Sequence, residues 1–335
     1  MKILFNKDQT GSTGADELSA ITGSYYANNN FPKIEMKLIL ETEKIIQVIG
    51  PAVYKLAEDC YYGTGDSEQY QELVRHIQLP VAISAVMRFN KGNIVSHEDS
   101  GRKLKLDKDN ESVPWEWMLD RDDEAHERDA FAAVDRLINY LDASGLQEWK
   151  DSEAQKLTRG LFVNSTAVFE RTYPIDNSGR FFYKVTPFIS EVERNTIRKA
   201  LGNIRYKDLL KWHQELDHSS DSEEDVATGG DLDKSLLLTL IRYCVPLLTM
   251  VIAVQRFSLL VLPEGVVQQY KSMNQTGNAS QAALEETRRR FIYSLQKQAD
   301  EKLDELKAYI QSADVNAMNY DLLPNNPCGQ KFFRT

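Results

Sequence analysis

The sequence has few cysteines and few histidines for its length. Its 335 residues include three cysteines, Cys60, Cys244 and Cys328, and five histidines. The cysteines are widely separated and odd in number, so they supply neither a disulfide framework nor a CxxC metal pair. The histidines show no HExxH motif and no other metal-ligand spacing. We therefore expect no metal site, and this cysteine usage favours a reducing compartment.

Motifs for phosphate binding and for acyl transfer are also missing. The sequence contains neither GxxxxGK[ST] nor GxSxG. Residues 123–126 spell DEAH, the acidic motif of one helicase class. They lie early in an expected amphipathic helix, where the helix dipole favours acidic side chains, and we interpret them as part of a helix start. The sequence thus predicts a protein that is not an enzyme and holds no cofactor.

Positive charge is scarcer than negative charge. The chain has 40 lysines and arginines against 50 aspartates and glutamates, a net charge of −10, which argues against nonspecific binding to DNA phosphates. The longest apolar segment, 231–257, contains Arg242 and Arg256. The stretch between these arginines is shorter than the roughly 20 residues that a membrane span needs. Residues 1–12 hold only one short apolar run, so we expect neither a membrane span nor a signal peptide.

A helical pattern occurs twice along the chain. Segments 72–89 and 237–257 are both apolar, both contain a proline and both end in Arg-Phe. Segments 41–55 and 193–207 share glutamate, isoleucine, glycine, tyrosine and lysine at a constant offset of 152 residues. In both halves these helices are followed by an irregular or hairpin excursion and a long amphipathic helix. We predict a mainly α-helical fold of two related helical domains from an internal duplication, with short β-hairpin excursions.

The predicted domain boundaries follow this repeat. Within the central connection, residues 180–186 (RFFYKVT) are rich in aromatic and β-branched residues and are expected to form a strand. The expected parts are an extended N-terminal arm (1–32), a first helical domain (33–143), a linker with a short helix and a hairpin (144–186), a second helical domain (187–311) and a C-terminal tail (312–335).

Most of the chain resembles a known group of proteins. The run SHEDSGRKLK…VPWEWMLDRDDEAHERDAFAAVDRLINYLD at 96–142 is similar to uncharacterised proteins from phages and prophages of Bacteroidetes, whose members lie among phage structural genes. The resemblance continues through the apolar Arg-Phe helix and LPEGV at 262–266. The helix pattern at 34–90 is also similar to the helical head–tail connectors that form a ring under the phage portal. Neither resemblance brings catalytic residues.

The resemblance implies a virion protein of the neck region that is made in the host cytoplasm. It implies a homo-oligomeric ring that binds the portal protein and tail or neck proteins, while DNA passes through without specific binding. An acidic stretch, 217–231, is then expected to line the channel, because like charge does not hold the phosphates; a solvated loop is the alternative. The candidate channel-lining residues are Asp217, Asp221, Glu223, Glu224 and Asp225.

Both termini carry apolar residues on polar segments, which are expected to order by docking onto neighbouring subunits. The candidate docking residues are Ile3, Leu4, Phe5, Phe332, Phe333 and Arg334. Two alternative functions stay open: a cytoplasmic adaptor that binds one partner through its long helices without symmetric assembly, and a hydrolase or nucleotide-binding enzyme with a site built from both halves.

Overall fold

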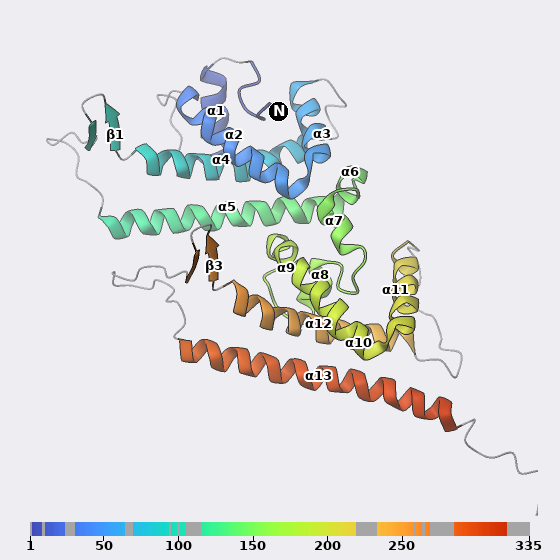
Figure 1. Ribbon diagram of the computed structural model, residues 1–335. Coiled ribbons are helices and arrows are strands. Elements are labelled where there is room, and N and C mark those ends of the chain that lie inside the picture. Colours follow the sequence, from blue (N-terminus) through green and yellow to red (C-terminus); the bar gives the residue numbers. More distant parts are fainter. Residues whose placement is uncertain are drawn as a thin grey trace, which may run out of the picture. The chain divides into compact units, whose positions relative to one another are not determined.

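A computed structural model of the chain is mainly helical, as the sequence predicts (Figure 1). Long helices dominate, and the strands are short. The structure describes residues 2–8, 11–23, 31–63, 70–93, 95–98, 101–104, 115–218, 233–257, 259–262, 265–268 and 285–319.

The chain divides into two compact units. Unit 1 comprises Met1–Leu157 with Asn177–Tyr183, and unit 2 comprises Thr158–Asp176 with Lys184–Thr335. The stretch predicted to be a linker, 144–186, is thus shared between the units. Several of its apolar residues are buried, with Trp149 only 1% exposed and Phe162 0% exposed.

Unit 1 is a bundle in which the long helices α4 and α5 lie side by side (Figure 1). Helix α2 ends at Ile49, just before Gly50, whose backbone has φ 87° and ψ 154°. Pro51 then starts the next helix at a position where a missing N–H costs nothing. The strands are antiparallel, with Val95 paired to Leu104. The elements are α1 (Gly11–Thr22), α2 (Phe31–Ile49), α3 (Pro51–Tyr62), α4 (Gln71–Asn93), β1 (Val95–Glu98), β2 (Gly101–Leu104), α5 (Glu116–Ser144), α6 (Gln147–Lys150) and α7 (Glu153–Thr158).

The N-terminal region is not the extended arm that the sequence predicts for residues 1–32. Residues 11–22 form α1, and Leu18 of this helix is fully buried. Leu4 and Phe5 are 1% and 2% exposed and belong to the same core as Ile34 of α2. Burial of these side chains removes a large apolar area from water, which stabilises the packed arrangement over a loose one.

Unit 2 is built around α12 and α13, which also lie side by side (Figure 1). Helix α9 begins among the unit 1 residues and continues in unit 2. The strands are antiparallel, with Leu259 paired to Gln268. The elements are α8 (Thr166–Glu170), α9 (Gly179–Val192), the π-helix η1 (Glu193–Ile197), α10 (Arg198–Leu201), α11 (Asn203–His218), α12 (Lys234–Arg256), β3 (Leu259–Leu262), β4 (Gly265–Gln268) and α13 (Glu285–Asn319).

The strand predicted at 180–186 is wrong, because these residues lie in α9. Phe182, Val185, Ile189 and Val192 are all buried. Their spacing of three, four and three residues is that of one face of a helix. The aromatic and β-branched composition of the segment therefore reflects burial of a helix face.

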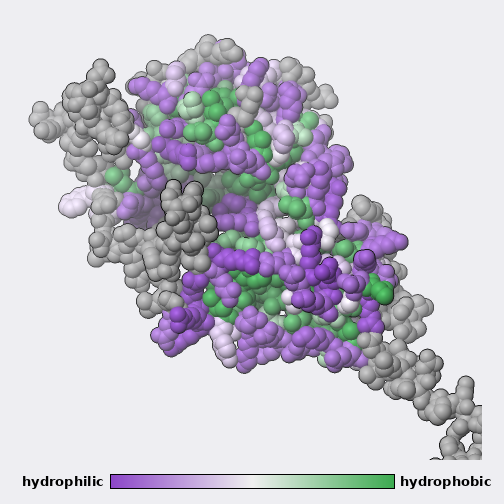
Figure 2. All heavy atoms as spheres, in the orientation of Figure 1, coloured by the Kyte–Doolittle hydropathy of each residue, from purple (hydrophilic) through white to green (hydrophobic). Residues whose placement is uncertain are grey.

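Helix α12 is the one helix in the described part of the chain that is long and apolar enough to cross a membrane, by length and composition alone. Of the most apolar stretch of this helix, 56% is buried inside the protein. The buried residues of α12 include Ile241, Cys244 and Val245. Figure 2 shows hydrophobic side chains along α12 and hydrophilic side chains over the outer face of α13. This burial is what the core helix of a helical bundle requires.

Candidate functional site

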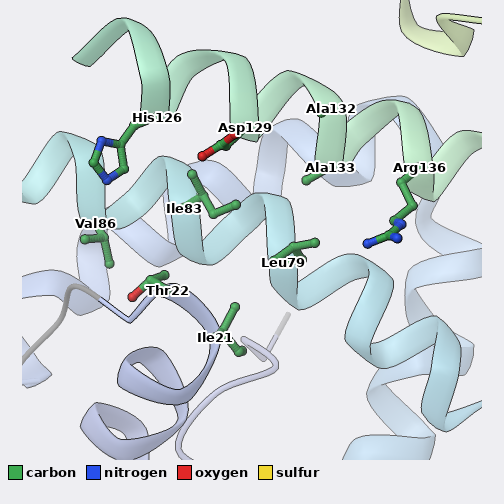
Figure 3. Close-up of a pocket in the computed structure, with 10 residues that line it drawn as sticks. All are labelled: Ile21, Thr22, Leu79, Ile83, Val86, His126, Asp129, Ala132, Ala133 and Arg136. Atoms are coloured by element: carbon green, nitrogen blue, oxygen red, sulfur yellow. The ribbon is translucent and has the colours of Figure 1, made fainter. Parts of the chain in front are cut away.

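A groove of about 400 Å³ opens in unit 1 where the end of α1 approaches α4 and α5 (Figure 3). Aliphatic side chains from α1 and α4 form its floor, and α5 contributes two alanines and three polar side chains. We call it the α1/α4/α5 groove. Its lining residues are Ile21, Thr22, Leu79, Ile83, Val86, His126, Asp129, Ala132, Ala133 and Arg136.

Apart from Thr22 of α1, the polar side chains of this groove come from α5. Nδ1 of His126 lies 2.9 Å from the carbonyl oxygen of Asp122, one turn earlier in the helix. Within the described residues, neither Asp129 nor Arg136 forms a hydrogen bond or an ion pair, and both are exposed. Figure 3 shows Asp129 toward the His126 end of the groove and Arg136 toward the other end. The groove thus offers two opposite charges without partners, on either side of a small-residue centre.

A second, wider groove of about 830 Å³ is lined by residues of α1, α3 and α4 and shares Ile21 and Leu79 with the first. Its carboxylate, Glu17, accepts hydrogen bonds from the Tyr61 hydroxyl at 2.7 Å and from the backbone N–H of Asn6 at 2.8 Å. Burial, together with the Glu17 carboxylate, raises the pKa of Tyr61. Glu17 is therefore engaged in holding the fold together.

The N-terminal segment of unit 1 is held by side chains from three positions. The Gln78 side chain donates to the carbonyl oxygen of Leu4 at 2.6 Å. The Tyr54 hydroxyl donates to the backbone carbonyl oxygen of Lys2 at 2.7 Å, and the Tyr62 hydroxyl donates to that of Ile3 at 2.8 Å. Docking onto a neighbouring subunit is predicted for Ile3, Leu4 and Phe5, but Leu4 and Phe5 are buried in their own unit. This placement contradicts the docking role of these two side chains, since they present no free surface.

In unit 2, the backbone of Phe162 and Val163 is held by side chains in a related way. Nε of Arg242 donates to the carbonyl oxygen of Phe162 at 3.1 Å. The carboxylate of Glu193 accepts the backbone N–H groups of Phe162 and Val163, at 3.0 Å and 3.1 Å. Glu193 is 0% exposed, and burial raises its pKa to about 8, although the two N–H groups and the cations Arg194 and Arg242 act in the opposite direction. This carboxyl is therefore neutral over much of the pH range in which an exposed glutamate is ionised.

The acidic candidates for channel lining fall almost wholly outside the described residues. Asp217 lies in α11. Asp221, Glu223, Glu224 and Asp225 lie outside the described residues, as do the predicted docking residues Phe332, Phe333 and Arg334.

The DEAH sequence lies on α5, early in that helix. Asp123 pairs with Lys91 at 3.3 Å, and Glu124 pairs with Arg128 at 3.7 Å. Among the described residues there is no group of three or more His, Cys, Asp or Glu side chains able to hold a metal ion. Here the acids of this motif act as helix-surface charges with basic neighbours.

One family of known sequences matches part of the chain. A family of unknown function, DUF6712, matches residues 45–159. This stretch runs from late in α2 to the end of α7 and includes the α4 and α5 walls of the groove. No curated protein and no solved structure matches the chain.

Proposed function

We propose that the chain is a structural protein of a bacteriophage virion. In this proposal it is a head–tail connector that forms a ring between the portal and the tail, around the channel through which DNA passes. The observation that carries the proposal is a helical unit whose element order occurs twice, in a chain whose segment 96–142 resembles phage structural proteins. A connector needs stable surfaces for several partners and no catalytic centre, and packed helix pairs supply such surfaces.

The internal duplication is part of this proposal. Gly50 and Gly202 lie 152 positions apart and have nearly the same backbone, with φ 87° and ψ 154° against φ 80° and ψ 156°. Each is followed four residues later by a buried tyrosine, Tyr54 or Tyr206, whose backbone N–H donates to the glycine carbonyl. This region of backbone space is open essentially only to glycine, so its recurrence at matching positions supports a common origin of the two units.

The long helices and the excursions extend the correspondence. Helices α4 and α12 each have 23 residues with an internal proline. Each is followed by a pair of four-residue antiparallel strands and then by a long helix. The side chain of Gln78 in α4 holds the Leu4 carbonyl, and that of Arg242 in α12 holds the Phe162 carbonyl.

Charge supports the proposed channel. The chain carries a net charge of −10, and a wall of negative charge would let a DNA duplex slide without condensing onto it. The acidic stretch 217–231 is the segment proposed for this role, and it directly precedes α12.

The experiment is to mix the purified chain with the portal protein of the phage to which it is proposed to belong and to image the mixture by negative-stain electron microscopy. We expect rings stacked coaxially on the portal, and portal alone is the control. Absence of both rings and portal binding would contradict the connector proposal. A one-to-one complex with a different partner by native mass spectrometry would favour the adaptor alternative. A thermal shift with nucleotides or divalent metals would favour the enzyme alternative.

A further inference from the structure

The exposed stripe of α5 that faces the α1/α4/α5 groove has a charge pattern that is complementary to itself. Ala125, Asp129, Ala132 and Arg136 are all exposed, and their spacing of four, three and four residues places them on one side of the helix. Asp129 and Arg136 lie three and four positions from Ala132 and are without partners among the described residues. A cation and an anion are therefore placed symmetrically about a centre of small side chains.

We propose that this stripe binds the same stripe of a second copy of the chain, with the two α5 helices antiparallel about a two-fold axis at Ala132 and Ala133. In an antiparallel pair the Asp129 of one copy faces the Arg136 of the other, and the same contact occurs twice. A parallel arrangement places like charges opposite each other, which is destabilising. Charge complementarity thus selects a second copy and also its direction.

The shape of the groove is compatible with a helix from the second copy. The small side chain of Ala132 at the centre lets two helix axes approach to within about 8–10 Å. The partly exposed Leu79 and Ile83 of α4 line the groove beside this stripe, so a helix laid along it would cover apolar surface as well as pair charges. With the axis at Ala132 and Ala133, Ala125 faces Tyr140, and no like charges meet.

The neighbouring face of α5 is already occupied within unit 1. The guanidinium of Arg180 lies 3.9 Å from the ring centre of Phe131, and Asp135 accepts hydrogen bonds from Ser178 and from the backbone N–H of Arg180. The face that carries Asp129 and Arg136 has no such cover from the described residues. Contact with a second copy is therefore directed to the groove side of the helix.

The test is the solution mass and dissociation constant of the full chain, by analytical ultracentrifugation, for four variants. Asp129→Arg and Arg136→Asp each turn both attractive pairs into repulsive ones, so we expect each to raise the dimer dissociation constant about tenfold or more. The double variant Asp129→Arg with Arg136→Asp restores opposite charges at both contacts and is expected to regain dimerisation. Arg128→Glu, which changes a side chain that is 80% exposed outside the stripe, is the matched control.

Circular dichroism and thermal melting of each variant separate loss of the contact from loss of the fold. A chain that stays monomeric up to its solubility limit would overturn the proposal. A dimer that ignores the single charge reversals, or that the double variant fails to restore, would also overturn it. The contact does not depend on the proposed connector function, because the free chain is measured without portal.

Discussion

The side-chain amide of Gln78 donates a hydrogen bond of 2.6 Å to the carbonyl oxygen of Leu4, 74 positions earlier in the chain. Gln78 is 9% exposed and Leu4 is 1% exposed. A buried carbonyl without a donor costs free energy, so this bond fixes where the N-terminal segment crosses α4. In unit 2, the Arg242 side chain likewise donates a hydrogen bond to the carbonyl oxygen of Phe162.

Replacement of Gln78 by leucine is expected to lower the free energy of unfolding by about 1–3 kcal/mol, because it leaves the Leu4 carbonyl buried and unsatisfied. Urea denaturation followed by circular dichroism measures the change. Gln71→Leu is the control, since Gln71 is exposed at the start of the same helix. Equal stability of the two variants would show that the bond to Leu4 contributes nothing.

The two glycine breaks provide a paired prediction. Gly50→Ala and Gly202→Ala are each expected to destabilise the protein by about 1–3 kcal/mol, because an L side chain is strained at their positive φ and extended ψ. The matched control is Gly92→Ala, at a helical position without positive φ and with nothing within 4 Å of an added Cβ. That variant is expected to be neutral or up to about 1 kcal/mol more stable. Thermal melting of the three variants gives the comparison, and losses confined to Gly50→Ala or to Gly202→Ala would contradict the equivalence of the two positions.

The sequence predicts the helical class and the position of local breaks because both depend on short-range patterns. Apolar residues at helical spacing identify α4 and α12, and the glycine followed by a proline at 50–51 marks the end of α2. The prediction of a strand at 180–186 is wrong because aromatic and β-branched residues on a buried face can match, over a few residues, both the two-residue period of a strand and the 3.6-residue period of a helix.

Long-range contacts account for the remaining differences. Nothing within residues 1–8 predicts that Leu4 and Phe5 are buried, because Gln78, Tyr54 and Tyr62 must first be brought together by the fold. The groove likewise consists of three helices, and its lining residues are ordinary when each helix is considered alone. One sequence signal does exist: Gln78 is a polar residue on the apolar side of α4, and buried polar side chains have partners.

The carboxylate of Asp142 is a hydrogen-bond centre within unit 1. One oxygen, Oδ1, accepts from Nε1 of Trp149 at 2.8 Å, from Nε2 of Gln155 at 2.8 Å and from the hydroxyl of Tyr183 at 3.1 Å. Asp142→Ala is expected to lower the free energy of unfolding by about 2–4 kcal/mol, because the buried Trp149 donor loses its acceptor. Asp151→Ala, which removes a carboxylate that accepts a hydrogen bond from the exposed Gln147 side chain in the same segment, is expected to change stability far less. Urea denaturation of the two variants is the measurement, and equal losses would argue against a central role for Asp142.

The buried carboxyl of Glu193 makes the stability of unit 2 depend on pH. Its pKa is raised from 4.5 to about 8 by burial, so the folded protein keeps this proton between those values while the unfolded chain releases it. The folded state then binds more protons than the unfolded state, and stability falls as pH rises through that window. Glu193→Gln cannot ionise, and its amide oxygen still accepts the N–H groups of Phe162 and Val163. We expect the variant to match the wild type near pH 5 and to exceed it by roughly 2–4 kcal/mol near pH 9.

The difference between wild type and Glu193→Gln isolates this group, because all other titrating residues are common to both proteins. Chemical denaturation across the pH range gives the two stability curves. Glu193→Ala is the second variant: it leaves the N–H groups of Phe162 and Val163 without an acceptor, so it should be less stable than Glu193→Gln at every pH by about 1–3 kcal/mol for each orphaned group. Parallel curves for wild type and Glu193→Gln would mean that the carboxyl titrates alike in the folded and unfolded states. The two N–H groups would then hold an ionised carboxylate, and burial would not be the dominant influence on its pKa.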